Sequence, residues 1–347
     1  MLPTTTHFDD IWQPAALMRA FGRARRAKRG KGGEPAFYFE LERNIAALSN
    51  ALRERTWRPD PYRYFIVRHT KERRVAEATF RDRVVHHALV AALEPPWEAR
   101  FSPHSYACRR DKGQHAALRA ASEIIGRHKF TLILDIHHYF DHVDHGILLG
   151  ALANTGADEG TLWLCGTILR AASTGGVGIP IGNLTSQFWA NAYLDAVDHI
   201  AGAQVGDGNY LRYMDDMLLV ADDKASLWRA HEAIAAHLTD QRRLALKPKA
   251  TRLLPVSEGV PWLGMRIFAS TVRLQHEGRA RLFRKLQQSA LRAQGDALAD
   301  EAEVARARSL CGHLQRPCVL PLRRAACSPW PKPPSTGPRA RATRDDG

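Results

Sequence analysis

The feature that most constrains this fold is a pair of acidic positions that lie far apart in the chain. Residues 130–136, FTLILDI, form a short apolar run that ends near Asp135, which predicts a buried strand with a carboxylate at its end. In NYLRYMDDMLLVA, two apolar runs flank Asp215 and Asp216, which predicts a hairpin with an acidic tip. Asp135 and Asp215 are 80 residues apart, so only a fold that pairs distant strands can bring them together.

Converging carboxylates of this kind suit chemistry on phosphate groups. Mg²⁺ prefers hard oxygen ligands and retains several waters, so two or three aspartates on adjacent strands suffice to hold it. Two such ions can activate a hydroxyl group and hold a triphosphate with its leaving group. Each part alone also has a plain structural explanation, because Asp-Asp is common in turns and an aspartate after a strand often caps a helix.

The chain is strongly basic, with 50 Lys and Arg against 36 Asp and Glu among 347 residues, a net charge of +14 and a pI near 9.9. Such a surface attracts polyanions, and nucleic acid is the expected partner. The N-terminal cations predict either a phosphate-binding arm or a solvated, disordered one. This cluster contains no acid and comprises Arg19, Arg23, Arg25, Arg26, Lys28, Arg29 and Lys31.

Cysteine usage and hydropathy exclude two other classes of protein. The five cysteines form no C-x-x-C pair, so neither a disulfide framework nor a zinc ribbon is expected. No run of about 18 apolar residues occurs, and the N-terminal stretch MLPTTTHFDDIW is polar and acidic. We therefore expect a cytoplasmic protein without a membrane span or an export signal.

Apolar residues at helical spacing predict helices at 37–55, from Arg81 to the Pro95-Pro96 pair, from Gly182 to about 200, and at 224–238. The second should end at the prolines, because an interior proline breaks a helix. A short hairpin is expected at 260–268 and a basic helix at 278–294. Seven of the 19 prolines lie after residue 316, which predicts a disordered tail.

Several motifs along residues 60–268 resemble, in their order, the bacterial reverse transcriptases related to group II introns. Among them, IGNLTSQ is most similar to the reverse transcriptases of diversity-generating retroelements. The motifs are TKERRV, FRDRVVHHAL, SYACRRDKGQHAAL, LDIHHYFDHVDH, GIPIGNLTSQFWANAYLDAVDH, YMDD, LKPK and WLG.

This resemblance implies an α+β right-hand polymerase. Its parts would be a basic arm and fingers at 1–130, a palm at 131–268 with an antiparallel sheet and helices on one face, a short helical thumb at 269–315, and the disordered tail at 316–347. The implied reaction is RNA-templated DNA synthesis from a DNA or RNA primer and deoxynucleoside triphosphates, with two Mg²⁺ ions, for which Mn²⁺ can substitute. A basic accessory protein is a further implied partner.

The resemblance also implies site residues. Asp135, Asp215 and Asp216 fall on the catalytic, metal-binding aspartates. Ile136 falls on a further position that binds the metal. Phe140 falls on an aromatic gate below the sugar, where a ring would exclude a 2′-hydroxyl.

Other positions match the family's contacts to the nucleotide. Lys71 and Arg73, with Arg74 as a neighbour, match the cations that grip the triphosphate, which charge-assisted bonds would favour; a solvated surface strand is the alternative. Ile181 and Gly182 match the segment beneath the nascent base pair, followed by Gln187 on the polar side of the helix.

The resemblance also bears on accuracy, on the leaving group and on the primer. Ile181 stands where many relatives have Gln, which predicts low accuracy. Lys247 or Lys249 is a candidate for the lysine near the leaving pyrophosphate. Trp262, Leu263 and Gly264 resemble a primer grip, for which a core hairpin is the alternative.

Two kinds of alternative stay open. One is a retron, group II intron-like or defence-associated reverse transcriptase. The other is a non-catalytic RNA-binding relative, which the proline-rich sequence after Gly312–Leu314 would favour because it departs from the basic thumb helix of relatives.

Histidine-rich segments invite a zinc hypothesis that we disfavour. His137, His138, His142 and His145 have spacings that can chelate a metal, but no cysteine joins them, and we expect surface residues. His86 and His87 are likewise expected on a helix surface.

Overall fold

The computed structural model describes residues 5–26, 28–68, 72–173 and 175–275, together with residues 280, 284, 285 and 288. The chain divides into two compact units, Met1–Glu258 and Gly259–Gly347. Apart from those four positions, the expected helix at 278–294, the thumb beyond residue 275 and the tail lie outside the described residues. The secondary structure is α+β with antiparallel sheets, as predicted.

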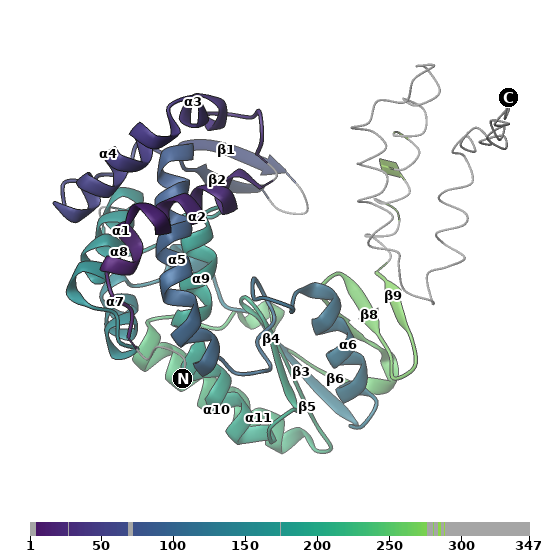
Figure 1. Cartoon of the computed structure of the whole chain (residues 1–347). Coiled ribbons are helices and arrows are strands. Elements are labelled where there is room, and N and C mark those ends of the chain that lie inside the picture. Colours follow the sequence, from purple (N-terminus) through teal and green to yellow (C-terminus); the bar gives the residue numbers. More distant parts are fainter. Residues whose placement is uncertain are drawn as a thin grey trace, which may run out of the picture. The chain divides into compact units, whose positions relative to one another are not determined.

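The first unit contains a four-stranded antiparallel sheet with the strand order β4-β5-β3-β6 (Figure 1). Its central strands are buried on both faces, which explains why their sequences are continuously apolar rather than alternating. The strands predicted around Asp135 and Met214 are confirmed. The four strands are β3 (Phe130–Leu134), β4 (Tyr210–Tyr213), β5 (Asp216–Ala221) and β6 (Arg252–Pro255).

Helices cover both faces of this sheet, so the expectation of helices on one face is wrong. On one side, Tyr210 and Arg212 of β4 bond to Asp198 of α10 (Asp195–Val205), and α11 (Lys224–Arg242) packs on β5 and β3. On the other side, α6 (Gln114–Ile125) packs on β4 and β5 (Figure 1). The alternate residue Leu211 is accordingly buried as well, because successive strand residues point to opposite faces.

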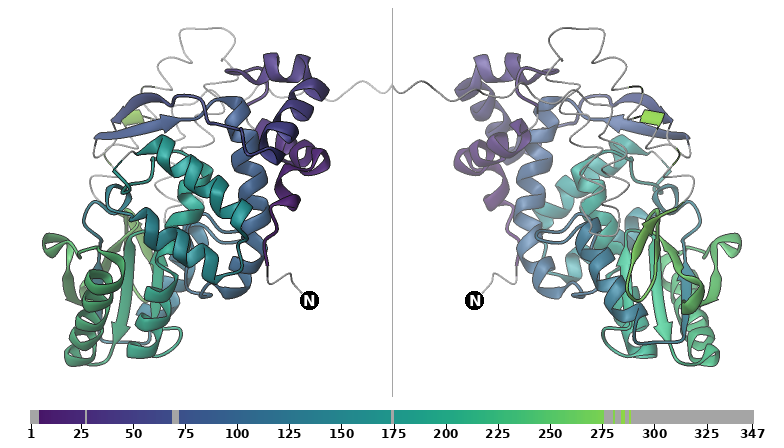
Figure 2. Two further views of the ribbon diagram at one scale, coloured as in Figure 1. Left: turned by 90° about the vertical axis from the view of Figure 1, so that its left-hand side faces the viewer. Right: turned by 90° about the vertical axis from the view of Figure 1, so that its right-hand side faces the viewer.

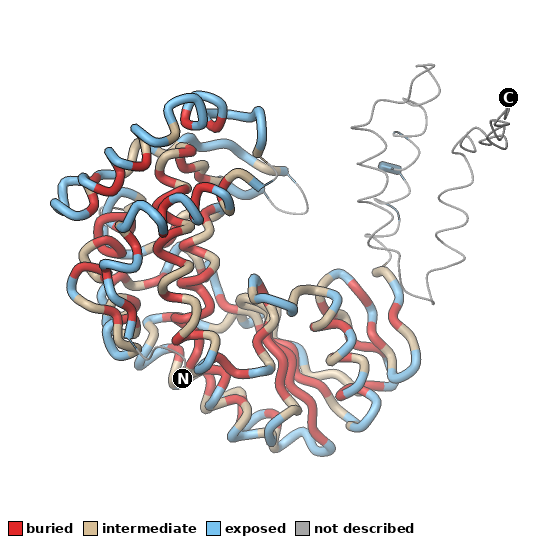
Figure 3. The backbone as a smooth tube through the Cα atoms, viewed as in Figure 1, coloured by how far each residue is buried: buried red, intermediate tan, exposed pale blue. Residues whose placement is uncertain are grey.

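The helical part of the first unit is built around α5, which is buried along most of its length (Figure 3). It packs against α2 and α9. Figure 2 shows the same helices from the two sides. Their bounds are α1 (Asp9–Trp12), α2 (Pro14–Arg25), α3 (Glu34–Phe39), α4 (Leu41–Arg53), α5 (Phe80–Arg100), α7 (His145–Asn154), α8 (Glu159–Ala172) and α9 (Leu184–Tyr193).

The prediction that Pro95-Pro96 ends a helix is wrong, because α5 continues to Arg100. A proline at 96 cannot donate to the carbonyl four residues earlier, which belongs to Ala92. The hydroxyl of Thr6 lies 3.4 Å from that carbonyl oxygen and donates to it. A distant segment therefore compensates for the lost helical bond.

Two predicted helices are each divided in the structure. The helix expected at 37–55 is split at Glu40, and the helix expected from Gly182 to about 200 is split at Leu194. The helix predicted at 224–238 is confirmed and extends to Arg242. Three short 3₁₀ turns complete the first unit: η1 (Tyr139–Asp141), η2 (Pro248–Ala250) and η3 (Val256–Glu258).

The N-terminal basic cluster lies partly on a packed helix. Helix α2 carries Arg19, Arg23 and Arg25, and it buries Leu17 and Phe21. The guanidinium of Arg25 lies over the Phe21 ring, 5.7 Å from its centre. The alternative of a disordered arm is therefore wrong for the residues of α2.

A two-stranded hairpin projects the basic segment of the first unit. Strands β1 (Arg63–Arg68) and β2 (Glu72–Glu77) pair antiparallel, with Arg68 opposite Glu72 at the turn. Three large apolar side chains on β1 are exposed to solvent: Tyr64 is 43%, Phe65 42% and Ile66 54% exposed.

The second unit begins with a three-stranded antiparallel sheet. Its strands are β7 (Val260–Trp262), β8 (Met265–Ile267) and β9 (Val272–Leu274), in that order. The hairpin predicted at 260–268 is confirmed.

Candidate active site

The pairing register of the sheet brings the two acidic segments together. Leu134 of β3 is paired with Met217 of β5, so Asp135 follows the last pair on one strand and Asp216 precedes it on the other. Neighbouring strands lie ~4.8 Å apart, which sets the two aspartate backbones side by side. Asp215 lies in the turn that joins β4 to β5, between Tyr213 and its paired residue Asp216. The sheet thus brings the backbones of the two acidic segments together.

A buried arginine supports the turn that carries Asp215. Arg212 is fully buried, and its Nη1 donates to the carbonyl oxygen of Met214 at 3.1 Å and to Asn191 Oδ1 at 3.1 Å. Its Nε and Nη2 each donate to the Asp198 carboxylate at 2.6 Å, and Nη2 also donates to Ser105 Oγ. Met214 has φ +57°, a strained left-handed conformation for a non-glycine residue. The arginine holds that strained turn.

The hydrogen-bond partners of Arg212 stabilise its positive charge. Burial lowers the pKa of the Arg212 guanidinium, but the charge of Asp198 and its hydrogen bonds outweigh burial and raise that pKa above its usual value. Close by, the Tyr139 hydroxyl donates to the carbonyl of Ala190 at 2.6 Å. Burial, and to a smaller extent the charge of Asp215, raise the pKa of Tyr139. The half-buried aspartate turn therefore rests on a packed core that contains polar side chains.

The other edge of β3 is extended by the segment containing Lys247. The amide of Lys247 donates to the carbonyl of Asp135 at 2.8 Å, and the amide of His137 donates to Ala245 at 2.9 Å. These two bonds flank a bridge between Ile136 and Leu246, so the backbone groups of Ile136 point away from Leu246, to the side where β5 lies. This register puts the backbone of Lys247 beside Asp135, whereas Lys249 lies in η2 and is exposed.

Phe140 lies in the 3₁₀ turn that follows Asp135. Its ring is half-buried and meets the Tyr139 ring edge-on, with centroids 5.5 Å apart. The carbonyl of Phe140 accepts from the amide of Ile179 at 2.8 Å. The turn is thus tied to the loop that leads to Ile181.

Gly182 is required by the packing of that loop against β2. The carbonyl of Ile181 accepts from the amide of Ala76 at 2.8 Å, and Gly182 has φ +110°. A Cβ at position 182 would lie 2.6 Å from Val75 Cγ1 and 3.1 Å from the carbonyl oxygen of Ala76. The glycine therefore permits a close approach of backbones, here between the loop and the hairpin.

Gln187 is half-buried one turn into α9.

The hairpin cations differ in their surroundings. Arg73 is exposed on β2, opposite Val67. The guanidinium of Arg74 lies 3.8 Å from the centre of the Tyr64 ring, a cation–π contact. Lys71 lies outside the described residues.

The predicted primer grip belongs to the second unit. Trp262 is 2% exposed at the end of β7. Leu263 and Gly264, with φ +48° and +77°, form the turn to β8. A role for these three residues at the primer stays a prediction.

The clustered histidines are mostly surface residues. His137, His138 and His142 are exposed, as predicted, whereas His145 is 7% exposed and its Nε2 lies 2.8 Å from the carbonyl oxygen of Gly178. The surface prediction is also wrong for His86, which is 2% exposed, because α5 is buried nearly all round.

No group of three His, Cys, Asp or Glu side chains that could hold a metal ion occurs within the described part of the chain. Asp135, Asp215 and Asp216 therefore do not form a closed cage there. Mg²⁺ is usually bound by one or two carboxylates with waters and substrate phosphates, rather than by an all-protein cage. The donor set of carboxylates at adjacent strand ends fits that ion.

Arg212 and Asp198 support the turn of the candidate site, and we did not predict them. The available signal was an arginine inside the apolar strand YLRY, directly before the acidic turn. A buried charge requires a partner, but sequence alone does not show that Asp198 supplies it.

Among the helices that the structure describes, none has both the length and the apolar character needed to cross a membrane.

The chain is similar to several known proteins. It is 24% identical to Protein YkfC of Escherichia coli over 275 residues, which cover 66% of this chain and 72% of that protein. It is 27% identical to the Group II intron-encoded protein LtrA of Lactococcus lactis over 167 residues, 45% of this chain and 28% of the other. It is 32% identical to Nuclear intron maturase 1, mitochondrial, of Arabidopsis thaliana over 103 residues, 29% of this chain and 14% of the other.

One solved structure with a similar arrangement is apo telomerase from Candida tropicalis truncated from its C-terminal domain. The TM-score is 0.49 at 9% identity, with 65% of this chain and 59% of the telomerase chain covered. The model of the family described as reverse transcriptase (RNA-dependent DNA polymerase) matches residues 66–267, more than half of the chain, and the acidic strand ends lie within that match. This chain is therefore a member of the reverse transcriptase family.

Proposed function

We propose that this protein is an active RNA-directed DNA polymerase, which copies an RNA template by extending a DNA or RNA primer with deoxynucleoside triphosphates. The observation that carries the proposal is the sheet register that sets Asp135 beside Asp216, with Asp215 in the adjoining turn. Membership of the reverse transcriptase family supports it.

The aspartates, with the backbone of Ile136, would hold two Mg²⁺ ions, or Mn²⁺ in their place. Such ions activate the primer hydroxyl and stabilise the negative charge of the leaving pyrophosphate. Arg212 keeps the aspartate turn in place through the Met214 carbonyl. Catalysis would then depend mainly on positioning and on charge stabilisation.

Residues of the hairpin and of the α9 entry would bind the nucleotide. Lys71 and the exposed Arg73 would grip the triphosphate, and Phe140 would stack below the deoxyribose. Gln187 would contribute from α9. In this proposal residues 1–130 form the fingers and 131–268 the palm.

The test is primer extension on poly(rA) with oligo(dT) by the Asp215→Asn and Asp216→Asn variants. Asparagine keeps the size of the side chain but removes a charged oxygen ligand, so extension should be abolished while RNA binding persists. Asp207→Asn is the matched control, because Asp207 is an exposed aspartate near the other end of β4. Full extension by the Asp215 and Asp216 variants would overturn the proposal, and RNA binding by an inactive wild type would favour the non-catalytic relative.

We further propose that synthesis is error-prone, as in diversity-generating retroelements, and that a basic accessory protein assists it. Ile181 is half-buried and apolar, so it gives contact without the directed hydrogen bond of an amide. A mismatched pair should therefore lose less binding energy here than opposite Gln, where a well-placed bond contributes about 1–3 kcal/mol.

Sequencing of cDNA copied from a defined RNA tests this. Misincorporation is expected to be frequent, especially opposite template adenine, and Ile181→Gln should reduce it. Ile181→Leu, which keeps an apolar side chain, should leave the error spectrum unchanged. A low and base-independent error rate in the wild type would instead favour a retron, intron-like or defence-associated enzyme.

A further inference from the structure

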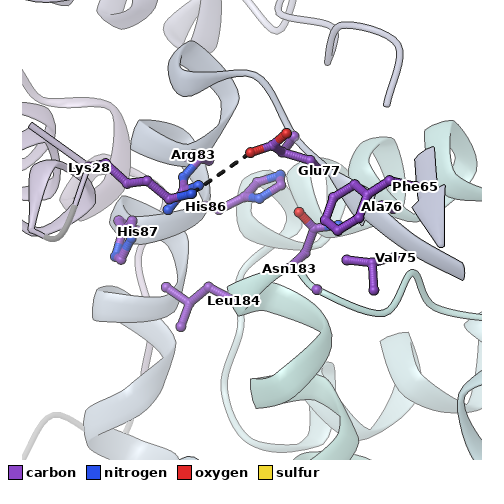
Figure 4. A pocket seen from close by; sticks show the side chains of 12 residues that line it. Lys28, Phe65, Val75, Ala76, Glu77, Arg83, His86, His87, Asn183 and Leu184 are labelled. Carbon is purple, nitrogen blue, oxygen red and sulfur yellow. Dashed lines mark ion pairs between the residues drawn. The ribbon is translucent and has the colours of Figure 1, made fainter. Parts of the chain in front are cut away.

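A cavity of about 160 Å³ lies behind Gly182, between the end of β2, the first half of α5 and the start of α9 (Figure 4). Phe65, Val75 and Leu184 supply apolar walls. The cavity shares Gly182 with the loop that we propose beneath the nascent base pair, so it is directly adjacent to that site.

Two buried polar side chains in this cavity each have one nitrogen without a hydrogen-bond partner in the described part of the chain. His86 is 2% exposed, and its Nε2 is buried without a partner within the described part of the chain. Asn183 is 4% exposed, and its Nδ2 is likewise unpartnered there. Asn183 is the N-cap residue of α9, yet its side chain makes no capping bond. Native proteins satisfy nearly all buried polar groups, so a site of this kind is completed by a ligand or by water.

The charges around the cavity are mainly positive. Lys28 and Arg83 line it with Glu77, and Lys28 lies 3.8 Å from the Glu77 carboxylate. The same Glu77 is already paired with Arg63 at 2.5 Å. Burial first, and then the charges of His87 and Arg83, lower the pKa of His86 to about 3. The histidine is therefore neutral at physiological pH, while the cations remain charged.

We propose that this cavity binds the unpaired template nucleotide that is next in line to be copied. Its base would enter between the apolar walls and bond with His86 Nε2 and Asn183 Nδ2, and its phosphate would be bound by Lys28 and Arg83. A neutral imidazole and an amide offer the directional bonds that a base uses, and the cations outside them suit a phosphodiester. This inference rests on the proposed polymerase function.

The experiment measures binding and extension of primer–RNA complexes that differ at one position. In one template the nucleotide following the copied base is intact, and in another it is abasic. The wild type should bind the abasic template about tenfold more weakly, the change expected from losing one recognised base. The variants His86→Phe and Asn183→Ala should bind the two templates equally.

The matched control is His237→Phe, because His237 on α11 also has a buried, unpartnered Nε2 but does not line the cavity. It should keep the wild-type preference for the intact template. Melting temperatures of all variants distinguish misfolding from loss of recognition, and Asn183→Ser supplies a second variant if one fails to fold.

The outcomes separate this inference from the proposed function. Wild-type extension with equal affinity for both templates would overturn the inference and leave the polymerase function standing. Absence of extension with every template would overturn the function. A third outcome would also overturn the inference. Inorganic phosphate could raise the melting temperature of the wild type but not of the His86 and Asn183 variants, while the wild type binds the abasic template as tightly as the intact one. The cavity would then be an anion site.

Discussion

The buried pair of Arg212 and Asp198 allows a prediction in which stability and activity respond differently. Both side chains are fully buried, and two hydrogen bonds of 2.6 Å join them. Replacing Asp198 with Asn keeps the shape but leaves the Arg212 charge without its counter-charge. Breaking a buried pair in this way costs about 3–5 kcal/mol of unfolding free energy. Urea denaturation followed by circular dichroism measures that loss.

The double variant Arg212→Met/Asp198→Leu removes both charges. Apolar replacement of a buried pair is often neutral in itself. Here it also leaves the carbonyl of Met214 and the polar atoms of Asn191 and Ser105 without their donor, at about 1 kcal/mol or more each. We therefore expect the double variant to recover only part of the stability lost by Asp198→Asn.

Activity should not return with stability in the double variant, because the bond from Arg212 to the Met214 carbonyl is still missing. The kcat of primer extension should stay at least tenfold below wild type, with a smaller change in the KM for nucleotide. The control is Glu159→Gln, which breaks the exposed Arg55–Glu159 pair and should cost less than about 1 kcal/mol. A cost below 1 kcal/mol for Asp198→Asn, or full activity in the double variant, would refute the reasoning.

Three further predictions follow from single side chains. Gly182→Ala should destabilise the fold by about 1–3 kcal/mol in denaturation experiments, because of its φ of +110° and the Val75 contact, whereas Gly150→Ala, in open space on α7, should stabilise it. His86 stays neutral when folded but takes up a proton when unfolded, so its contribution to stability should fall by ~1.4 kcal/mol per pH unit from pH 6.5 towards its pKa of about 3; this slope should vanish in His86→Phe. Phe140→Ala should raise the incorporation of ribonucleotides relative to deoxynucleotides in single-nucleotide extension, and an unchanged ratio would remove Phe140 from the sugar gate.

Local sequence pattern was sufficient for the central strands and for the acidic hairpin. The apolar run before Asp135, the two runs around Met214 and the helix from Lys224 are defined by residues close together in the chain. The apolar pattern of each of these elements lies within the element itself, so local propensity and periodicity are enough to predict the element. The order of the motifs likewise indicated the family from the sequence alone.

Other features depended on partners that are distant in sequence. Helix α5 passes through Pro95-Pro96 because α5 is packed on both sides and Thr6 bonds to the freed carbonyl of Ala92. His86 is buried because α2 and α9 pack around α5, which no periodicity within α5 reveals.

The sequence by itself determined which residues we propose for the chemistry, because Asp135, Asp215 and Asp216 stand in recognisable local motifs. Only the tertiary structure decided how they are held. Pairing of β3 with β5 sets the register of the aspartates, and Asp198 neutralises an arginine whose own strand gives it no counter-charge. The physical reason is that burial and charge pairing are properties of the whole packed fold, whereas strand and turn propensity act over a few residues.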